Sequence, residues 1–360
     1  MDKNGNGYIH TLNQSLKIFF RDAFKYTIRT PGQALYFLNV VRWQTKAIRR
    51  RKRSAKQGLH VPPMIIFSVT NKCNLQCKGC YAQALNRLNN DELSDGDIAR
   101  ILQEAYELGT SFFILAGGEP LVRKQIMDIT SRFTDVLFLM FTNGLLLDEK
   151  LMTRLKKQKN VIPVLSLEGH QSETDTRRGD GVYAVLKKQV AELKRRNIFF
   201  SVSFTVTSNN IQSISDPELI QDLIHSGCRL FFFLEYTPIK TGTDAWIPSE
   251  EQRDKFNQTI EKFRKMYPAL FVSIPDDEEQ FGGCLSSGRG FLHISANGDL
   301  EPCPFVPLTD TSLKHHSFKD ALRSRLLRVI RDNADQLEEG RGGCTLWNKR
   351  EWVQSLLEAE

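Results

Sequence analysis

Apolar runs that suit β-strands alternate with stretches that suit amphipathic helices, and this alternation constrains the fold of the chain most strongly. The runs are short and rich in β-branched and aromatic residues, whereas the stretches between them repeat apolar residues at helical spacing. Six such units predict a parallel sheet with right-handed crossovers, either a partial barrel or a doubly wound sheet. The predicted strands are Met64–Val69, Ser111–Ala116, Val136–Phe141, Val161–Leu167, Phe199–Val206 and Leu230–Leu234, and the clearest predicted helices are Asp97–Leu108, Glu149–Gln158, Val182–Arg196 and Pro217–His225.

The alternation changes at about Pro248, where a different pattern begins. An Asn-Gly pair at 297–298 separates two short apolar runs, which is a strong hairpin signal. We therefore divide the chain into a helical, basic N-terminal segment (1–60), an α/β core (61–247) and a C-terminal extension (248–360). The elements predicted in the extension are a helix over Glu250–Met266, a hairpin of Phe291–Ile294 with Asp299–Pro302, and a helix near Phe318–Arg331.

Composition and cysteine usage place the chain among intracellular globular proteins. Its 360 residues, 41% of them hydrophobic, suffice for one large α/β domain with a smaller one. The cysteines are too few and too scattered for a disulfide framework, which predicts a reducing, cytoplasmic compartment. The sequence shows neither a secretory signal pattern nor an apolar run long enough to predict a membrane span.

Residues 1–58 carry all of the excess positive charge, with 13 Lys and Arg against 2 Asp and Glu in a chain of net charge +7. Aromatic and aliphatic residues recur there at near-helical spacing on both sides of Pro31-Gly32, and the basic run Arg49–Arg53 follows. The pattern fits an interfacial helix at the inner face of an anionic membrane, or a helical extension packed on the barrel. Contact with nucleic acid is the interpretation we favour least. We expect the barrel beyond Pro63 to fold without this segment.

Three cysteines, Cys73, Cys77 and Cys80, form the spacing C-x3-C-x2-C directly after the first predicted strand. Three thiolates within eight residues can bind three irons of a [4Fe–4S] cube and leave the fourth iron without a protein ligand. An open iron can bind a substrate or cofactor, so the spacing predicts chemistry rather than electron storage. A structural zinc site is the alternative, but it typically needs four ligands, and the nearest histidine is His60.

This string resembles the cluster motif of the radical S-adenosylmethionine (radical SAM) enzymes, and later segments resemble the same family in the same order, from about Pro63 to the C-terminus. The resemblance selects a partial (β/α)6 TIM-type barrel. It implies that SAM chelates the open iron and is cleaved by an electron from the cluster to methionine and a 5′-deoxyadenosyl radical, which abstracts a substrate hydrogen. The residue before the last cysteine is often aromatic in this family and packs near the adenine. Here it is Gly79, and Tyr81 follows the cysteine.

The resemblance also implies SAM contacts where the second, third and fourth strands end. Glu119 lies in a Gly-Gly-Glu-Pro string like the one that holds the SAM amino group, and Ser166 precedes Glu168 in a serine, hydrophobe, acid, glycine string. A loop arginine can bind the SAM carboxylate through two hydrogen bonds. We assign Arg178, although its neighbour Arg177 leaves the register open. The candidate SAM-binding residues are Tyr81, Gly117, Gly118, Glu119, Pro120, Thr142, Asn143, Ser166 and Arg178.

Cys284, Cys303 and Cys344 form a second constellation in the C-terminal extension. The sequence around them resembles the SPASM extension or its shorter twitch form. The resemblance implies one auxiliary [4Fe–4S] cluster with these three ligands, and its fourth ligand stays open. Cys228 is a remote candidate that we interpret as a buried structural thiol. Free thiols or a zinc site are the alternatives for the three.

Taken together, these features predict a radical SAM [4Fe–4S] enzyme. Its substrate is not written in the sequence: a peptide undergoing maturation, a lipid or isoprenoid, and a cofactor precursor all fit. The expected partner is an electron donor of the flavodoxin or ferredoxin type. The alternative functions are a non-catalytic iron–sulfur electron carrier and a zinc-stabilised scaffold, and the Gly117–Pro120 segment argues against a carrier, which needs no SAM site.

Overall fold

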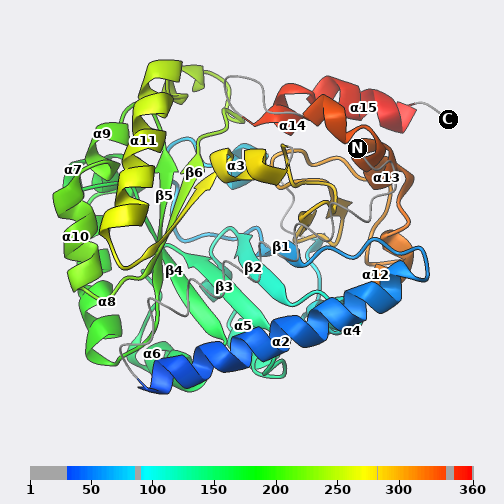
Figure 1. Cartoon of the computed structure of the whole chain (residues 1–360), viewed down its shortest axis with the longest axis horizontal. Helices are drawn as coiled ribbons and strands as arrows, with labels where there is room; N and C mark the ends of the chain where they lie inside the picture. The colour runs from blue at the N-terminus through cyan, green and yellow to red at the C-terminus, as the bar shows by residue number, and fades with distance from the viewer. Residues whose placement is uncertain (1–30, 86–90, 282, 338–343, 359–360) are drawn as a thin grey trace.

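The computed structural model describes residues 31–85, 91–281, 283–337 and 344–358. Its centre is a curved sheet in the order β7-β6-β5-β4-β3-β2-β1-β8-β9, with parallel neighbours except for the antiparallel pair β8 and β9 (Figure 1). The predicted α/β fold class, a partial barrel, is confirmed. The strands are β1 (Met64–Thr70), β2 (Phe112–Gly117), β3 (Leu137–Thr142), β4 (Val161–Leu167), β5 (Ser201–Val206), β6 (Leu230–Glu235), β7 (Leu270–Ile274), β8 (Phe291–Ile294) and β9 (Leu300–Glu301).

The two faces of the sheet pack differently, because successive strand side chains point to opposite sides. On β3, Phe138 and Met140 are fully buried in the core beneath the outer helices. Leu137 and Leu139, between and beside them, belong to a second apolar cluster on the inner face of the barrel. Each such side chain contributes about 1.5–3 kcal/mol by leaving water. The strands are therefore apolar on both faces, which is typical of parallel strands covered on both sides.

The helices cover the outer face of the sheet and its two ends (Figure 1). α4 illustrates why the chain forms them where it does. Its start is a capping box in which the Ser94 side chain and backbone pair with Asp97, and it ends at Gly109, whose φ is 119°. The helices are α2 (Pro31–Ala55), α3 (Tyr81–Ala84), α4 (Asp95–Leu108), α5 (Ile126–Thr130), α6 (Glu149–Lys157), α7 (Gln171–Arg178), α8 (Val182–Arg195), α9 (Ile211–Ile214), α10 (Pro217–His225), α11 (Glu250–Met266), α12 (Phe318–Ala321), α13 (Arg325–Asp332), α14 (Thr345–Asn348) and α15 (Arg350–Glu358).

The C-terminal extension prolongs the barrel sheet at both of its edges. β7 adds to β6 in parallel, so the sheet continues past the boundary suggested at residue 247. The β8–β9 hairpin has the predicted position, and β8 also pairs in parallel with β1, with Ile66 opposite His293. The single helix expected over Phe318–Arg331 is instead two helices, because Ser324 begins the second one by capping the amide of Leu327.

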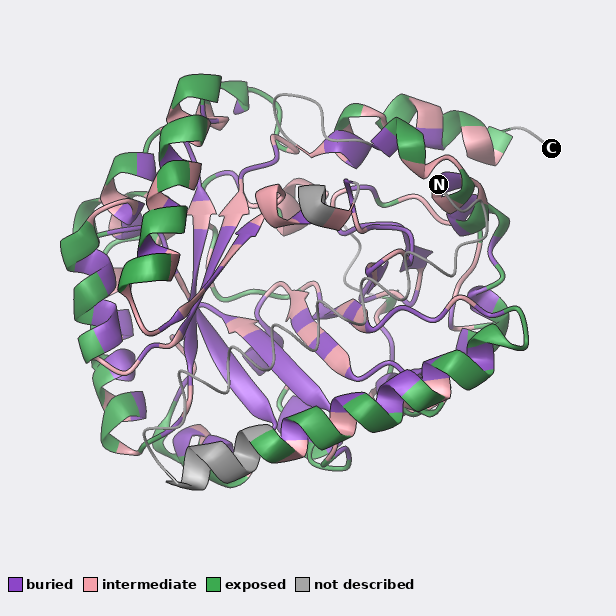
Figure 2. Ribbon diagram, viewed as in Figure 1, coloured by how far each residue is buried: buried purple, intermediate pink, exposed green. Residues whose placement is uncertain are grey.

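Helix α2 lies across the end of the barrel where the strands begin, and one of its faces is buried (Figures 1 and 2). Val40 joins the apolar cluster of the inner sheet face. The Gln44 side chain accepts a 2.7 Å hydrogen bond from Ser111, and the buried Arg51 guanidinium donates to the carbonyl of Gly109 at 2.6 Å. This face matches the interpretation of a helical extension packed on the barrel. That the barrel folds without residues 1–58 stays a prediction, and these contacts argue against it.

The opposite face of α2 is exposed and basic. Residues 1–30, including the apolar pattern before Pro31, lie outside the described residues. Within the part of the chain that the structure describes, no helix combines the length and the hydropathy needed to cross a membrane. The exposed basic residues of α2 and the turn that follows it are Arg42, Lys46, Arg49, Lys52, Arg53 and Lys56.

Candidate active site

The N-terminal cysteine triad lies on the loop from β1 to α3, at the edge of the barrel where the parallel strands end. Cys73 is exposed, whereas Cys77 and Cys80 are half-buried. The loop starts from a fixed base, because the carboxylate of Glu92 accepts a 2.7 Å hydrogen bond from the backbone amide of Asn71. All three thiols therefore project from one short loop on a rigid strand end, which is where parallel α/β folds place their sites.

The glycine pair at the end of β2 allows this loop to lie directly on the strand. A Cβ on Gly117 would lie 2.3 Å from the carbonyl oxygen of Thr70, and one on Gly118 would lie 2.1 Å from that of Lys72. Gly117 also has a φ of 116°, a conformation that glycine adopts without strain. The close approach that these glycines permit is to the backbone of the cysteine loop.

Glu119 joins the end of β2 to the end of β3. Its carboxylate is buried and accepts hydrogen bonds from the Thr142 hydroxyl (2.8 Å), the Asn143 amide (2.8 Å) and the Leu121 amide (3.1 Å). Burial raises the pKa of this carboxyl, and the hydrogen bonds oppose the shift. Both oxygens have protein donors, which gives the carboxylate an organising role. Each oxygen can accept a further hydrogen bond, so its expected contact with an ammonium group stays a prediction. Pro120, buried at the start of a 3-10 turn, fixes the chain beside it.

Asn143 connects β3 to the cysteine loop. Its side-chain amide donates a 2.7 Å hydrogen bond to the Asn74 side chain and lies 4.0 Å from the sulfur of Cys73. Its own backbone is held by Glu119. The candidate residues of the second and third strands are therefore brought together around the first cysteine of the triad.

The end of β4 carries a buried cluster of charges. Glu168 is 1% exposed and forms ion pairs with both arginines of α7. Its Oε1 lies 2.6 Å from Nη2 of Arg178 and also contacts Nη1 of Arg177. Arg177 also donates to the hydroxyl of Thr205 at 2.8 Å. Burial lowers the pKa of Arg178, but the charges of Glu168 and of the nearby Cys77 outweigh it, so the net shift is upward. The other oxygen of Glu168 is buried without a hydrogen-bond partner among the described residues.

Helix α7 and the inner strands complete this side of the site. The amide of Lys78, within the triad loop, donates a 2.8 Å hydrogen bond to the carbonyl of Arg177, which ties α7 to the cysteines. Ser166 on β4 lies beside Ser203 on β5, with 3.4 Å between their hydroxyls. The choice between Arg177 and Arg178 as the cofactor-binding arginine therefore matters less, because both guanidinium groups bind the carboxylate of Glu168.

These surroundings suit an iron–sulfur cluster and a cofactor that carries both an amino and a carboxylate group. Burial raises the pKa of the Cys73 and Cys77 thiols, and the positive charge of Arg178 opposes that shift at Cys77. A guanidinium beside the thiols favours their anionic, iron-binding form. The unpartnered oxygen of Glu168 remains as an acceptor for a ligand hydroxyl or amine.

The three C-terminal cysteines also converge. Cys284 and Cys303 are buried in one apolar cluster, and the half-buried Cys344 packs against it. A hydrogen bond from Cys303 lowers the pKa of Cys344, whereas burial raises the pKa of the other two thiols. Across the described residues, no three Cys, His, Asp or Glu side chains already stand in an arrangement that holds one metal ion. The residues expected to bind the auxiliary cluster nonetheless share one site.

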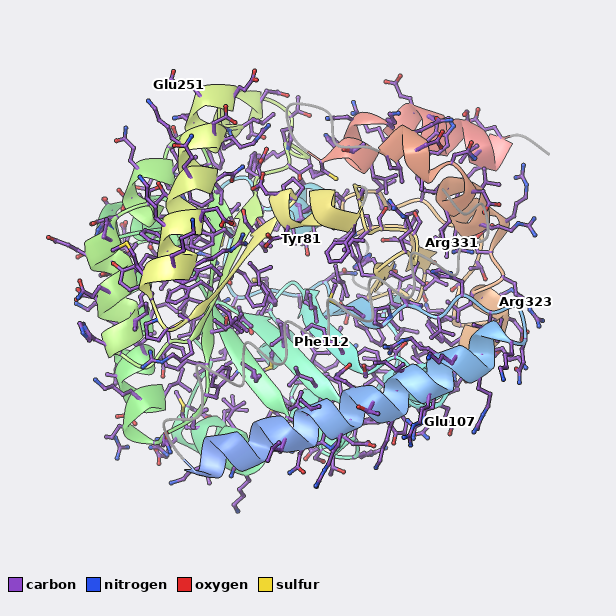
Figure 3. All side chains as sticks on the ribbon, in the orientation of Figure 1. Tyr81, Glu107, Phe112, Glu251, Arg323 and Arg331 are labelled. Carbon is purple, nitrogen blue, oxygen red and sulfur yellow. The ribbon has the colours of Figure 1, made fainter. Side chains whose placement is uncertain are left out.

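Two aromatic contacts at the triad were not expected from the sequence. Tyr81 packs edge-on against Phe305 of the extension, with ring centres 5.2 Å apart. In the view of Figure 3, Tyr81 lies farther from α2 than Phe112 does. In addition, the ring of Trp246 and the hydroxyl of Tyr236 lie against Gly79. The one signal that pointed to this second contact was the glycine itself, which leaves room beside the loop for a side chain from elsewhere.

A buried polar chain links the extension to β1. His293 Nδ1 lies 2.6 Å from the carboxylate of Glu301, and its Nε2 lies 2.8 Å from the hydroxyl of Ser68. All three side chains are at most 5% exposed. Sequence spacing gave no sign of this group, because Ser68 on β1 is far in the chain from the hairpin that carries His293 and Glu301, although β1 and β8 are adjacent in the sheet.

A family model described as the radical SAM superfamily matches residues 67–230, from β1 to the start of β6. An AdoMet-dependent heme synthase of Methanosarcina barkeri is 24% identical over 315 residues, which cover 79% of this chain and 88% of that protein. A PqqA peptide cyclase of Granulibacter bethesdensis is 28% identical over 259 residues, covering 67% and 68% of the two chains.

Solved structures share the fold. Streptococcus suis SuiB bound to the precursor peptide SuiA superimposes with a TM-score of 0.64 at 18% identity, over 83% of this chain and 72% of that chain. Native anSMEcpe with bound AdoMet gives a TM-score of 0.60 at 14% identity, over 82% and 98%. At these identities the likeness concerns the arrangement of helices and strands.

Proposed function

Because this chain belongs to the radical SAM superfamily through residues 67–230, we propose that it cleaves SAM reductively and uses the product to abstract hydrogen from an organic substrate. The chain is a radical SAM enzyme, and its family implies a [4Fe–4S] cluster and SAM. When bound, the pair would supply an electron and a 5′-deoxyadenosyl radical. An electron carrier or a zinc scaffold would not need the ordered contacts between the strand ends and the cysteine loop.

One observation carries this proposal: the cysteine loop rests on the ends of β2 and β3, which hold it through backbone contacts at Gly117 and Gly118 and through Asn143. Cys73, Cys77 and Cys80 would bind three irons. The half-buried backbone at the end of β2 and the remaining acceptor capacity of the Glu119 carboxylate would accept hydrogen bonds from the SAM amino group.

The charged cluster at the end of β4 would hold the remaining polar groups of the cofactor. Arg178 would bind the SAM carboxylate, since its guanidinium lies beside Cys77. Ser166 lies on the same inner face as Ser203 and would contact the bound cofactor. The unpartnered oxygen of Glu168 would accept hydrogen bonds from ribose or substrate hydroxyls.

We further propose that Cys284, Cys303 and Cys344 bind an auxiliary [4Fe–4S] cluster. Support comes from their convergence in one buried cluster, although they are far apart in sequence. The aromatic contact of Tyr81 with Phe305 brings this site next to the triad loop. An external electron donor of the flavodoxin or ferredoxin type would reduce the enzyme.

Two substrate classes are favoured by specific relatives. Two heme synthases align over 79% and 81% of this chain, which favours a tetrapyrrole or another cofactor precursor as the first candidate. A peptide is the second, since SuiB was solved with a precursor peptide and a bacteriocin biosynthesis protein of Bacillus subtilis is 27% identical over 77% of this chain.

The decisive experiment is SAM cleavage by anaerobically reconstituted, dithionite-reduced protein, with 5′-deoxyadenosine measured by chromatography and mass spectrometry. The triple variant of Cys73, Cys77 and Cys80 to Ala should lose cleavage and the iron of one cluster but keep the iron of the auxiliary site. Cys228→Ala is the matched control, because this buried thiol donates to the carbonyl of Leu230 within the core. It should retain cleavage.

The outcomes separate the parts of the proposal. Unchanged 5′-deoxyadenosine from the triple variant would refute the SAM site, and zinc or no metal in that variant would refute the auxiliary cluster alone. Adding iron-coproporphyrin III to the wild type should accelerate 5′-deoxyadenosine formation if the first substrate class is correct. Acceleration only by a precursor peptide would transfer the proposal to the second class.

A further inference from the structure

The connection between β6 and α11 places the ring of Trp246 and the hydroxyl of Tyr236 against the backbone of the cysteine loop. Gly79 lies between Cys77 and Cys80. A Cβ added to it would stand 2.6 Å from Cζ3 of Trp246 and 2.7 Å from the hydroxyl oxygen of Tyr236. Gly79 also has a φ of 68°, so a side chain at this position would be strained as well as blocked. The rings therefore occupy the position that a side chain of the loop would otherwise fill.

Both rings are held firmly. Tyr236 is buried, and its hydroxyl donates a 2.8 Å hydrogen bond to Thr243. Its ring centre lies 5.3 Å from that of Trp246, with an angle of 46° between the planes. The carbonyl of Trp246 accepts a 2.8 Å hydrogen bond from the amide of Ser208, at the end of β5. The pair is thus fixed to two strands of the barrel before any ligand binds.

The burial of the two rings differs in a way that matters for binding. Tyr236 is 3% exposed, whereas Trp246 is half-buried. Tyr81, the aromatic residue on the other side of the triad, is turned edge-on to Phe305 of the extension. Trp246 is therefore the ring that combines contact with the triad loop, a fixed position and an accessible surface.

We infer that Trp246, supported by Tyr236, is the surface on which the adenine of SAM stacks in this protein. The inference rests on the proposed function, because it requires SAM at the triad. A cofactor whose amino and carboxylate groups lie at the cysteines must place its base close to their loop. An aromatic base gains most by lying against another aromatic ring. The connection after β6 thus supplies the adenine contact. Gly79 is required because any larger residue at this position would clash with the ring of Trp246.

The test measures SAM binding to cluster-loaded protein without reductant, so that no cleavage occurs, by equilibrium dialysis with radiolabelled SAM. Trp246→Ala should raise the dissociation constant by about 5- to 150-fold, the usual effect of removing a ring that stacks on a base. Trp246→Phe should stay near the wild type. Trp246→Leu, which fills space without an aromatic ring, should resemble the Ala variant. Tyr267→Ala, which removes a ring from the end of α11, should leave binding unchanged.

Two further measurements separate stacking from a merely structural contact. Iron content should be the same in all of these variants, and S-methylmethionine, a sulfonium without the base, should bind Trp246→Ala and the wild type equally. In reduced enzyme the variant should raise the KM for SAM and leave kcat nearly unchanged. Wild-type affinity in Trp246→Leu, or an equal loss of S-methylmethionine binding, would overturn the inference while wild-type SAM cleavage keeps the proposed function intact.

Discussion

Glu119 is a buried carboxylate that acts on the site through other residues. Its hydrogen bonds reach the hydroxyl of Thr142 and the amides of Asn143 and Leu121. Through Asn143 it sets the position of the side chain that contacts Asn74 and Cys73. A carboxylate suits this task because each of its oxygens can accept more than one hydrogen bond.

Replacing Glu119 by Gln should therefore damage the site although the shape of the side chain is kept. Gln has one acceptor oxygen, so at least one buried donor loses its partner, which typically costs about 1–3 kcal/mol. We expect the free energy of unfolding to fall by about that amount and the SAM dissociation constant to rise. Both are measured by urea denaturation and by equilibrium dialysis on cluster-loaded protein.

Glu251→Gln provides the control for this prediction. Glu251 pairs with Lys255 on the exposed outer face of α11, where an ion pair contributes little (Figure 3). It should change neither quantity. If Glu119→Gln matched this control, the organising role would be wrong.

At the scale of residues, the sequence predicted which residues lie together at the site but not which contacts hold them in place. The spacing of Cys73, Cys77 and Cys80 and the glycines at 117 and 118 are local patterns, so they are visible in one dimension. The role of Glu119 depends on β3 lying beside β2, and the contact of Trp246 with Gly79 depends on the closure of the barrel. Neither is encoded in local spacing.

Among the elements, α2 combines two faces with different tasks. The buried face closes the end of the barrel with Val40, and Arg51 donates to Gly109 in place of solvent. Burial lowers the pKa of Arg51 to about 10, which leaves it charged at neutral pH. The exposed face is basic and also presents Leu38 and Val41 at 47% and 39% exposure.

Truncation separates the parts of the N-terminal segment. A chain that begins at residue 31 should keep the stability of the full chain, because α2 and its contacts remain. A chain that begins at residue 59 exposes the apolar end of the barrel and leaves the carbonyls of Leu108 and Gly109 without donors from α2. We expect it to aggregate or to melt at a clearly lower temperature in thermal scans. Equal melting of all three chains would show that α2 is dispensable.

We propose that the exposed face of α2 docks on anionic membrane. Each basic residue near such a surface contributes about 1 kcal/mol, and the attraction is screened by salt. The triple variant K46E/R49E/R53E should therefore sediment much less than the wild type with vesicles rich in anionic lipid. Sedimentation should fall with salt and be weak with zwitterionic vesicles.

The matched control carries the same change of charge on a different helix. Lys255, Lys262 and Lys265 are exposed on α11, and their change to Glu should leave most of the vesicle binding. If both triple variants lose binding equally, the attraction is a matter of net charge and not of α2. If the wild type binds no anionic vesicles at low salt, membrane docking is wrong.

In the molecule as a whole, the extension is joined to the start of the barrel by a half-buried histidine. His60, just before β1, donates from Nε2 to the carbonyl of Gly288 at 2.8 Å. Burial, followed by the charge of Arg331, lowers its pKa to about 4. The folded state therefore holds this imidazole neutral, while the unfolded chain protonates it below its ordinary value of about 6.5.

The sign of the pH dependence follows from this difference. The contribution of His60 is present above about pH 6.5 and is lost as the pH falls toward 4, so it should weaken by about 2 kcal/mol between pH 7 and pH 5. His60→Gln removes the titration and should lose less stability over the same interval in urea denaturation. Parallel pH profiles for the two proteins would contradict this account.

At the scale of the molecule, the pattern of strands predicted the barrel but not its full extent. The hairpin turn at Asn297-Gly298 is a local signal and was placed correctly. Its parallel pairing with β1 was not predictable, because it joins strands that no short connection relates. β7 lies at the edge of the sheet, and the polar Ser273 interrupts its apolar run, so its pattern is less marked than that of β6.

The pairing of β8 with β1 has a consequence for how the protein is made. Met64 leaves the ribosome long before its sheet partner Phe291, and at about 5–20 residues per second the interval is about 10–45 s. During that time β1 has β2 on one side and an open backbone edge on the other. The cysteine loop that follows β1 is then not yet covered by Phe305. Translation thus creates a period in which the triad loop is reached without the extension beside it, and the contact of Tyr81 with Phe305 ends that period.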